Sequence, residues 1–452
     1  MSDFLRTRAS ALRRFAARPG APYLALALVL LALHAQFRLG TGDDPMYASI
    51  LDNYTLWGFT EQHYYTWSAR SLVEAALCVV EALPTVLWRV ADPLLIALCA
   101  YLAARILGCE KNADAGWALA GLALCYDWTA MRTAGWVCTT LVFVWPLAAA
   151  LAAAQPLVQA RRGLRVPRWA YVPAALAAVY AANMEQLMAA MALCLLALLA
   201  HDAAARRKPA GFTWVLLAAC AANAVYAVTC PGTAARAAGE ATSWFIDFAR
   251  RTFLENAQLG IASAMAGAVY ERDVLFFLLC LGLAVAVWAH GQSWLLRAAT
   301  AAGALAVLVL GVFGRQAVAL VPKLAFFENA VTKYGVVHTA TAWEPKRWLS
   351  FLLLLFVLAV CVVGLYAAIG HSRRAYFSIA ALCAGFAARA MLGFSPTVWQ
   401  SGARTGFFFG CACVYCAVNV WLSLAGCRRA RLVWGASIAL GAAWGVFHLI
   451  GA

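Results

Sequence analysis

Long apolar runs separated by short polar connections form the dominant pattern of this chain. Each run is close to the length that an α-helix needs to cross a bilayer, about 17 to 25 residues. The pattern predicts spans at 22–38, 93–108, 115–131, 135–156, 169–183, 185–200, 212–229, 274–290, 299–321, 348–370, 375–393, 404–426 and 433–451. We therefore predict an all-α polytopic integral membrane protein with about 13 (11–14) transmembrane helices.

Two regions fit this pattern less well. The runs 169–183 and 185–200 are short for full spans, so we expect one or both to be tilted, thinned or re-entrant. Segment 71–90 is apolar, yet it contains two glutamates, a proline and an arginine, and counting it as a span would invert every basic loop that follows. We predict an amphipathic helix there, lying on the outer surface of the membrane.

The composition agrees with a chain that lies almost wholly in a bilayer. Of its 452 residues, 65% are hydrophobic and only 12% are charged, and the mean hydropathy is +0.76, which is outside the range of soluble domains. Residues 1–452 are therefore predicted to form a single transmembrane domain. Most of the 15 cysteines lie in apolar segments, including Cys411, Cys413 and Cys416, so we expect helix-packing residues and no disulfide framework.

The net charge of +15 is best explained by membrane topology. The basic residues stand in short runs between apolar segments and do not form a stripe on a polar domain, so nucleic-acid binding is not expected. Cytoplasmic loops are enriched in Lys and Arg, which predicts a cytoplasmic N-terminus and places the short basic turns on the inner side. No small-residue cleavage site follows the first apolar run, which indicates an uncleaved span and not a signal peptide.

This orientation leaves four substantial connections on the outer side of the membrane. They are 39–92, which contains the amphipathic helix, and 230–273, 322–347 and 394–403. Because the inner side receives only short turns, we expect any catalytic or binding residues on the outer side or at the outer membrane boundary.

An acidic pair, Asp43 and Asp44, directly follows the first predicted span and precedes Pro45. A carboxylate at the end of a transmembrane helix is partly desolvated, which raises its basicity towards that of a general base. One carboxylate could take a proton from an attacking hydroxyl while the other orients that hydroxyl or binds a metal. The alternative is a solvated turn, and the dipeptide alone does not separate the two.

The same loop continues with Tyr65, Trp67, Arg70 and Glu74. Arg70 and Glu74 are four residues apart, so on a helix they share a face and can form a surface ion pair worth at most about 0.5 kcal/mol. Alternatively, the Arg70 guanidinium faces a ligand while Tyr65 and Trp67 form a platform for a sugar ring. Aromatic residues at the membrane interface are the competing explanation for this pair.

Ionisable residues at predicted span ends on the outer side form the strongest functional signal. They are Arg132, Glu185, which is followed by Gln186, Arg236, Lys323 and Arg404. Several cations near an acidic loop, at the level of lipid headgroups, suit a phosphate-bearing ligand whose tail stays in the bilayer. We predict that Glu185 supports one of these cations or the acceptor. Each arginine could instead extend to lipid headgroups.

Five short motifs resemble those of a bacterial family of polytopic membrane proteins of unknown function. The motifs are Asp43-Asp44-Pro45, Trp67-Ser68-Ala69-Arg70, Asn183-Met184-Glu185-Gln186, the Pro-Gly-x-x-x-Arg stretch that ends at Arg236, and Ser395-Pro396-Thr397 with a following Arg404. That family is similar to GT-C glycosyltransferases and to the serotype-converting glucosyltransferases of O-antigen modification. Ala69 and Thr233 stand where Gly and Asn are expected.

The resemblance implies a GT-C-like fold, a bacterial inner (plasma) membrane location and transfer of a sugar from a polyprenyl-phosphate donor to a glycan or lipid acceptor of the cell envelope, such as lipopolysaccharide, on the periplasmic face. It implies that Asp43 or Asp44 activates the acceptor, that Arg70, Arg236, Lys323 and Arg404 bind phosphate, and that Glu74, Glu185, Gln186, Trp67 and Tyr65 support them. No cofactor is predicted, although a divalent metal is compatible with the acidic pair.

Two other functions fit the same sequence. A transporter or flippase for a lipid-linked or anionic solute would place polar residues and broken helices near the membrane midplane, often in two related halves. A non-catalytic subunit of an envelope assembly complex would not need the acidic pair. The chain lacks the glycine-rich phosphate loops of nucleotide-binding domains, which favours a lipid-linked donor over a nucleotide sugar.

Overall fold

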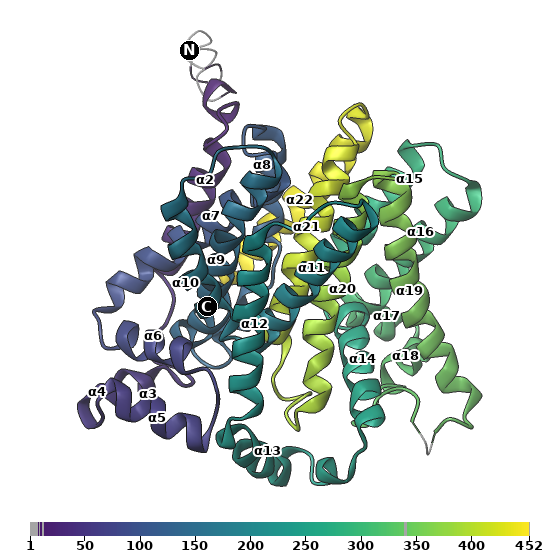
Figure 1. Cartoon of the computed structure of the whole chain (residues 1–452). Helices are drawn as coiled ribbons and strands as arrows, with labels where there is room; N and C mark the ends of the chain where they lie inside the picture. Colours follow the sequence, from purple (N-terminus) through teal and green to yellow (C-terminus); the bar gives the residue numbers. More distant parts are fainter. Residues whose placement is uncertain (1–7, 9, 11–12, 339–340, 452) are drawn as a thin grey trace.

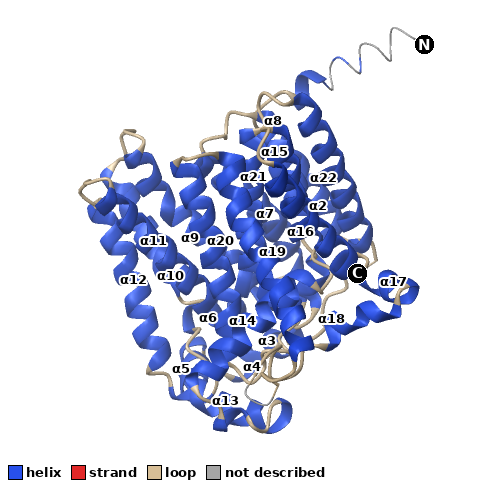
Figure 2. Ribbon diagram, turned by 90° about the vertical axis from the view of Figure 1, so that its right-hand side faces the viewer, coloured by secondary structure: helices blue, strands red, loops and turns tan. Residues whose placement is uncertain are grey.

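The computed structural model describes residues 8, 10, 13–338 and 341–451. In this part of the chain the secondary structure is helical and no strand is present. Long helices stand side by side in one bundle, and several short helices lie across the end of the bundle away from the N-terminus (Figures 1 and 2). The predicted all-α class is confirmed.

The helices of the first half are α2 Ala21–His34, α3 Asp44–Ala48, α4 Ile50–Asn53, α5 Leu56–Thr66, α6 Ser71–Glu81, α7 Thr85–Leu107, α8 Ala113–Leu124, α9 Trp136–Arg161, α10 Tyr171–Ala182, α11 Glu185–Ala204 and α12 Gly211–Val228. Those of the second half are α13 Pro231–Trp244, α14 Phe253–Val269, α15 Val274–Ala289, α16 Trp294–Val307, α17 Gly314–Leu320, α18 Ala325–Asn329, α19 Pro345–Ile369, α20 Arg373–Ala390, α21 Phe407–Ser423 and α22 Arg428–Leu449. Short helical turns join them: η1 Trp128–Arg132, η2 Arg168–Ala170, η3 Phe248–Arg250, η4 Leu308–Val312, η5 Pro322–Leu324, η6 Met391–Phe394 and η7 Ala403–Gly406.

Nine helices in the described part of the chain are long and apolar enough to cross a membrane. They comprise α7, α9, α11, α12, α16 with η4, α19, α20 with η6, α21 with η7, and α22. The chain is therefore a multi-pass membrane protein. Every predicted span contains a helix, but the count of about thirteen is not confirmed, because α2 has 14 residues and α8 and α10 have 12 each.

Helices α14 and α15 form a bent pair that would make a tenth span, with an angle of 76° between them. The segment 230–273 was predicted as a loop, whereas α14 occupies its second half and is buried on most sides from Leu259 to Val269. Small residues permit this packing. A side chain on Gly260 would come within 1.8 Å of the Ala390 carbonyl oxygen, so α14 contacts the end of α20 backbone to backbone. The small residues also weaken the apolar signal of α14.

Helix α21 lies near the centre of the bundle and is the most buried of the nine spans. Large indole rings fill the space around the bundle core, and their N–H groups find protein acceptors. Trp88 donates to Thr140 Oγ1 at 3.0 Å, and Trp434 donates to the Leu278 carbonyl at 3.0 Å. Both rings are almost fully buried. Buried indole rings whose N–H groups are hydrogen-bonded in this way fix the register between neighbouring helices.

The segment predicted as one amphipathic helix over 71–90 is divided at Pro84. Residues 71–81 form α6, whose buried positions Val73, Glu74, Leu77 and Cys78 recur every three or four residues, as expected for an amphipathic helix. The remaining residues belong to α7, which starts at Thr85, eight residues before the predicted span. Proline at the N-cap fixes this break, because the residue before a proline is disfavoured in a helix.

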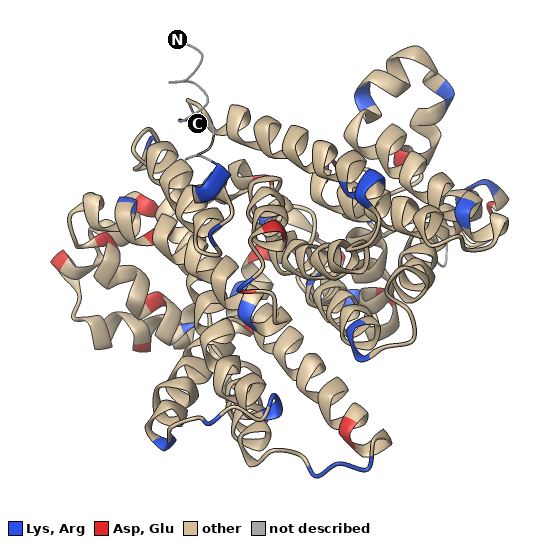
Figure 3. Ribbon diagram, turned by 90° about the horizontal axis from the view of Figure 1, so that it is seen from above, with Lys and Arg blue, Asp and Glu red and all other residues tan. Residues whose placement is uncertain are grey.

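Charged residues concentrate at the helix ends and in the connections, as Figure 3 shows from the N-terminal side. At the opposite end of the bundle, α3 and α6 pack against α9, α5 packs against α6, and α13 packs across α5. Figures 1 and 2 both show α5 and α13 beyond the ends of the long helices. Two of the five sequence motifs, Asp43-Asp44-Pro45 and the stretch that ends at Arg236, overlap these elements, and Trp67-Ser68-Ala69-Arg70 joins α5 to α6. These elements define the candidate site.

Candidate functional site

The loop after α2 folds back against the residue pair that precedes α9. Gly42 and Gly135 have backbone φ angles of 63° and 97°, which only glycine adopts without strain. The Asp43 N–H donates to the Ala134 carbonyl at 3.1 Å. A side chain on Gly42 would lie 2.4 Å from the Ala134 carbonyl carbon. The two glycines therefore permit the backbone contact that positions the acidic pair.

The two acids of this pair have different environments. Asp44 is 2% exposed, and its Oδ1 accepts from the backbone N–H of Cys138 at 3.0 Å, in the first turn of α9. A carboxylate at this position satisfies a free helix N–H and interacts favourably with the helix dipole. Asp43 is exposed and close enough to Arg404 for their charges to attract. Asp43 is therefore the acid that a ligand can reach.

Glu81, at the end of α6, faces Asp44 and the start of α9. Its Oε1 lies 3.9 Å from the Cys138 Sγ. Burial and the neighbouring Asp44 carboxyl group raise the pKa of Glu81 to about 8. Glu81 therefore retains a proton at neutral pH unless a cation replaces that proton.

Arg70 pairs with Glu185 and not with Glu74. Its Nε donates to Glu185 Oε2 at 2.7 Å, which joins the turn before α6 to the first residue of α11. The carboxylate of Glu74 instead accepts from Ser68 Oγ at 2.6 Å and lies 3.1 Å from His63 Nδ1. Glu74 is buried, so it stabilises the loop from inside, and the surface pair between Arg70 and Glu74 considered above does not form.

The side-chain amides of Asn183 and Gln186 form hydrogen bonds with the backbone of neighbouring elements. The Asn183 Oδ1 accepts from the N–H groups of Leu72 and Val73, and its Nδ2 donates to the Ala69 carbonyl at 3.0 Å. The Asn183 side chain thus serves as the N-terminal cap of α6, in place of a capping residue within that helix. Gln186 Nε2 donates to the carbonyls of Ala388 and Thr405, which ties α11 to α20 and to the turn that contains Arg404.

The Pro-Gly motif positions Arg236. A side chain on Gly232 would lie 2.3 Å from the Trp67 nitrogen, so only glycine lets the start of α13 contact the end of α5. One helical turn later, the Arg236 guanidinium lies 4.8 Å from the centre of the Trp67 ring. Burial and the nearby Arg70 lower the pKa of Arg236. The ring face of Trp67 that was a candidate sugar platform is thereby covered by a cation.

The structure brings together Asp43, Arg70, Arg236 and Arg404. Arg70 is close enough to both other arginines for their positive charges to repel, and Arg404 also donates to Thr133 Oγ1 at 3.0 Å. Asp43 lies before α3, Arg70 before α6, Arg236 in α13 and Arg404 in η7. We call this set the arginine cluster.

Two predicted residues are not part of the arginine cluster. Lys323 is exposed on η5, between α17 and α18, which lie apart from α5 and α13 in Figures 1 and 2. Tyr65 is 59% exposed, and its ring meets only the edge of the Tyr64 ring among the aromatic contacts of the described residues. Neither residue is positioned to act with Asp43.

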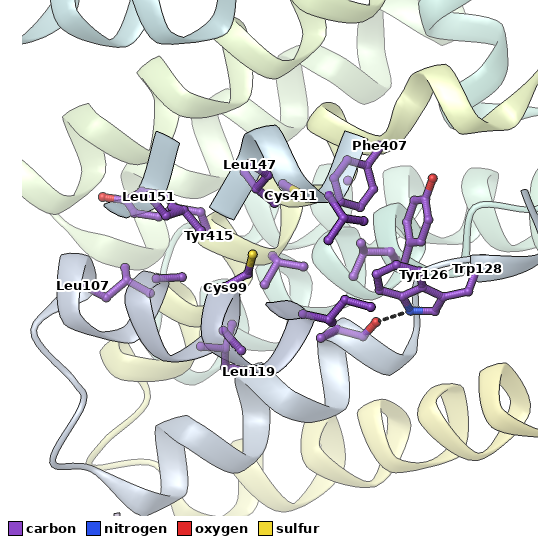
Figure 4. Close-up of a pocket in the computed structure, with 18 residues that line it drawn as sticks. Cys99, Leu107, Leu119, Tyr126, Trp128, Leu147, Leu151, Phe407, Cys411 and Tyr415 are labelled. Atoms are coloured by element: carbon purple, nitrogen blue, oxygen red, sulfur yellow. Dashed lines mark hydrogen bonds between the residues drawn. The ribbon is translucent and has the colours of Figure 1, made fainter. Parts of the chain in front are cut away.

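Two cavities share part of their lining and contain no residue of the arginine cluster. A polar one of about 400 Å³ lies between η1, η7 and the bend at 270–273, and its lining includes Asp127, Glu271 and Arg389. An apolar one of about 140 Å³ is enclosed by α7, α8, α9, α15 and α21 (Figure 4). Tyr126 and Trp128 line both cavities. The Trp128 indole is held in place by a bond to the Ala123 carbonyl, drawn dashed in Figure 4.

Sequence reasoning missed the contributions of Glu81 and Cys138. Glu81 was used as an argument against a transmembrane span over 71–90 and was not assigned to the site, and Cys138 was grouped with helix-packing cysteines. A glutamate that interrupts an apolar run is a recognisable signal. Cys138 had no comparable signal, because its closeness to both acids depends on how α6 packs against α9.

No family model, no curated protein and no solved structure matches this chain.

Proposed function

We propose that this chain is a membrane glycosyltransferase of the GT-C type. It transfers a sugar from a polyprenyl-phosphate donor to a glycan or lipid of the cell envelope, for example O-antigen of lipopolysaccharide, on the periplasmic face of the bacterial inner membrane. The observation that carries this proposal is the arginine cluster. It sets one exposed carboxylate beside three guanidinium groups at one end of a transmembrane bundle.

The chemistry assigns one role to the acid and another to the cations. Asp43 takes the proton of an acceptor hydroxyl, and the hydroxyl oxygen attacks the anomeric carbon of the donor sugar. The bond from that carbon to the phosphate oxygen breaks, and the electron pair stays on the carrier phosphate. Arg70, Arg236 and Arg404 stabilise this developing negative charge. A single displacement inverts the anomeric configuration.

The cavities support a donor with a lipid tail. The apolar cavity has no charged residue in its lining, which suits a hydrocarbon chain. The polar cavity that adjoins it at Tyr126 and Trp128 contains carboxylate groups that can accept hydrogen bonds from sugar hydroxyls. Because the two cavities share Tyr126 and Trp128 in their linings, the tail and the sugar of one donor can occupy neighbouring sites.

The test is transfer of radiolabelled sugar from a panel of polyprenyl-phosphate sugars to envelope glycans by the purified, reconstituted protein. Asp43→Asn should lower the transfer rate at least about a hundredfold, because general base catalysis contributes that much. Asp52→Asn is the matched control, since Asp52 is an exposed acid of the same loop. Full activity of Asp43→Asn would contradict the assignment. Uptake or scrambling of the lipid without transfer would instead favour the transporter.

A further inference from the structure

Two carboxyl groups and a thiol meet at the start of α9. Ligand atoms of Asp44, Glu81 and Cys138 all lie within 4.8 Å of one another. The three residues come from different elements: the loop after α2, the end of α6 and the first turn of α9. We call them the acid–thiol cluster.

Asp44 has one carboxylate oxygen that accepts no hydrogen bond. Its Oδ1 accepts from the Cys138 backbone, but its Oδ2 is buried and has no hydrogen-bond partner. Among the described residues, the ion pairs formed by Lys, Arg and His involve neither Asp44 nor Glu81. A buried carboxylate without a partner is unfavourable by several kcal/mol, and a second carboxyl group beside it increases that cost.

Other polar atoms near this point of the chain are also buried and without partners. They are Thr41 Oγ1, two residues before the acidic pair, and Trp136 Nε1 and Thr139 Oγ1 in the first turn of α9. Native proteins rarely leave buried polar groups unsatisfied, so a concentration of such atoms indicates a bound ion or water.

We propose that the acid–thiol cluster binds a divalent metal ion of the zinc type through Asp44 Oδ2, a Glu81 carboxylate oxygen and the Cys138 sulfur. A thiolate ligand favours Zn²⁺ over Mg²⁺ or Ca²⁺, which bind oxygen ligands. Three protein ligands leave a fourth position for water, as in catalytic zinc sites.

Binding displaces protons from the acid–thiol cluster. The Cys138 thiol and the Glu81 carboxylic acid each lose a proton to solvent, and the metal takes their place between the two acids. The positive charge then compensates the buried carboxylates that lack a basic partner. This inference does not depend on the proposed glycosyl transfer, since metal binding is measured without a sugar donor.

The experiment uses the purified full-length protein in detergent. Metal content is measured by mass spectrometry after dialysis, and Co²⁺ is titrated while the near-ultraviolet absorption that a thiolate–cobalt bond produces is recorded. The variants are Cys138→Ala and Glu81→Gln. The matched control is Cys220→Ala, which removes another buried cysteine, on α12, away from the acid–thiol cluster.

We expect one metal ion per chain in the unmodified protein and in Cys220→Ala. Cys138→Ala should abolish the absorption band. Glu81→Gln keeps the size of the side chain and adds an amide donor beside Asp44, so it should keep the fold and weaken Co²⁺ binding at least about tenfold. The inference is overturned if the unmodified protein shows neither stoichiometric metal nor the band, because Asp44 and Glu81 then share a proton. A band that survives in Cys138→Ala would overturn it as well.

Discussion

Single residues determine whether the acidic pair reaches its position. Gly42 and Gly135 are the points where the loop after α2 touches the start of α9, and neither has room for a side chain. The backbone contact between them places Asp44 under the first turn of α9 and leaves Asp43 exposed. The difference in exposure between Asp43 and Asp44 therefore depends on two glycines, which have no side-chain functional group.

Gly135→Ala should destabilise the protein by about 3 kcal/mol. An added Cβ would lie 2.0 Å from Asp44 Oδ1, so the carboxylate must leave the helix end, and alanine is also strained at this positive φ. The measurement is the apparent Tm of the purified protein in detergent. Gly163→Ala is the control, because Gly163 also has a positive φ but open space around it, and its expected cost is about 1 kcal/mol. Equal losses would contradict this explanation.

At the scale of elements, the amides of one motif hold together helices that are far apart in the sequence. Asn183 caps α6, and Gln186 joins α11 to α20 and η7. Arg70 stands immediately before α6, so the position of its guanidinium depends on that cap as well as on Glu185. The motif residues between α10 and α11 thus position the cations, although they need not contact a ligand.

Asn183→Ala should lower stability by roughly 3 kcal/mol, since three hydrogen bonds to backbone groups are lost at about 1 kcal/mol each. If the chain is the proposed transferase, the KM for the lipid-linked donor should also rise, because Arg70 loses its fixed position. Thermal unfolding and transfer kinetics measure the two effects. Asn53→Ala, an exposed asparagine of the same loop region, should change neither quantity. An unchanged Tm for Asn183→Ala would exclude the capping role.

At the scale of the whole molecule, five helices enclose the apolar cavity of Figure 4, and no single helix defines it. Ala103 lines the cavity from α7, while Leu98 of the same helix faces outward and is 43% exposed. The same substitution at these two positions therefore distinguishes the effect of filling the cavity from the effect of changing the outer surface of α7.

Ala103→Phe should fill the cavity and raise the KM for a lipid-linked donor about tenfold with little change in kcat, since it removes binding that is equal in the ground and transition states. Leu98→Phe adds the same ring on the outer surface and should leave the KM unchanged. The measurement is the transfer rate as a function of donor concentration. An equal effect of both substitutions would show that the cavity does not hold the lipid.

The orientation of the bundle leads to a further prediction. Ser49 lies with the arginine cluster at one end, and Arg165 lies in the connection after α9, at the other end. Both are exposed. In intact cells, a membrane-impermeant thiol reagent should label Ser49→Cys from outside and should label Arg165→Cys only after the membrane is disrupted, with the parental chain as background. The reverse pattern would place the N-terminus outside.

The helical class, the multi-pass character and most of the helix positions could be predicted from the sequence alone. These follow from local patterns, because a span must present apolar side chains along its whole length. The sequence also identified Asp43, Arg70, Arg236 and Arg404, since charged residues at span ends are conspicuous. Which of these residues lie close together depends on the tertiary structure. It separated Asp43 from Asp44, left Lys323 outside the arginine cluster, and brought Glu81 and Cys138 to Asp44. Such contacts depend on how α6 and α13 pack across the ends of other helices, and that packing is set by small residues and buried amides that leave no periodic signal in the sequence.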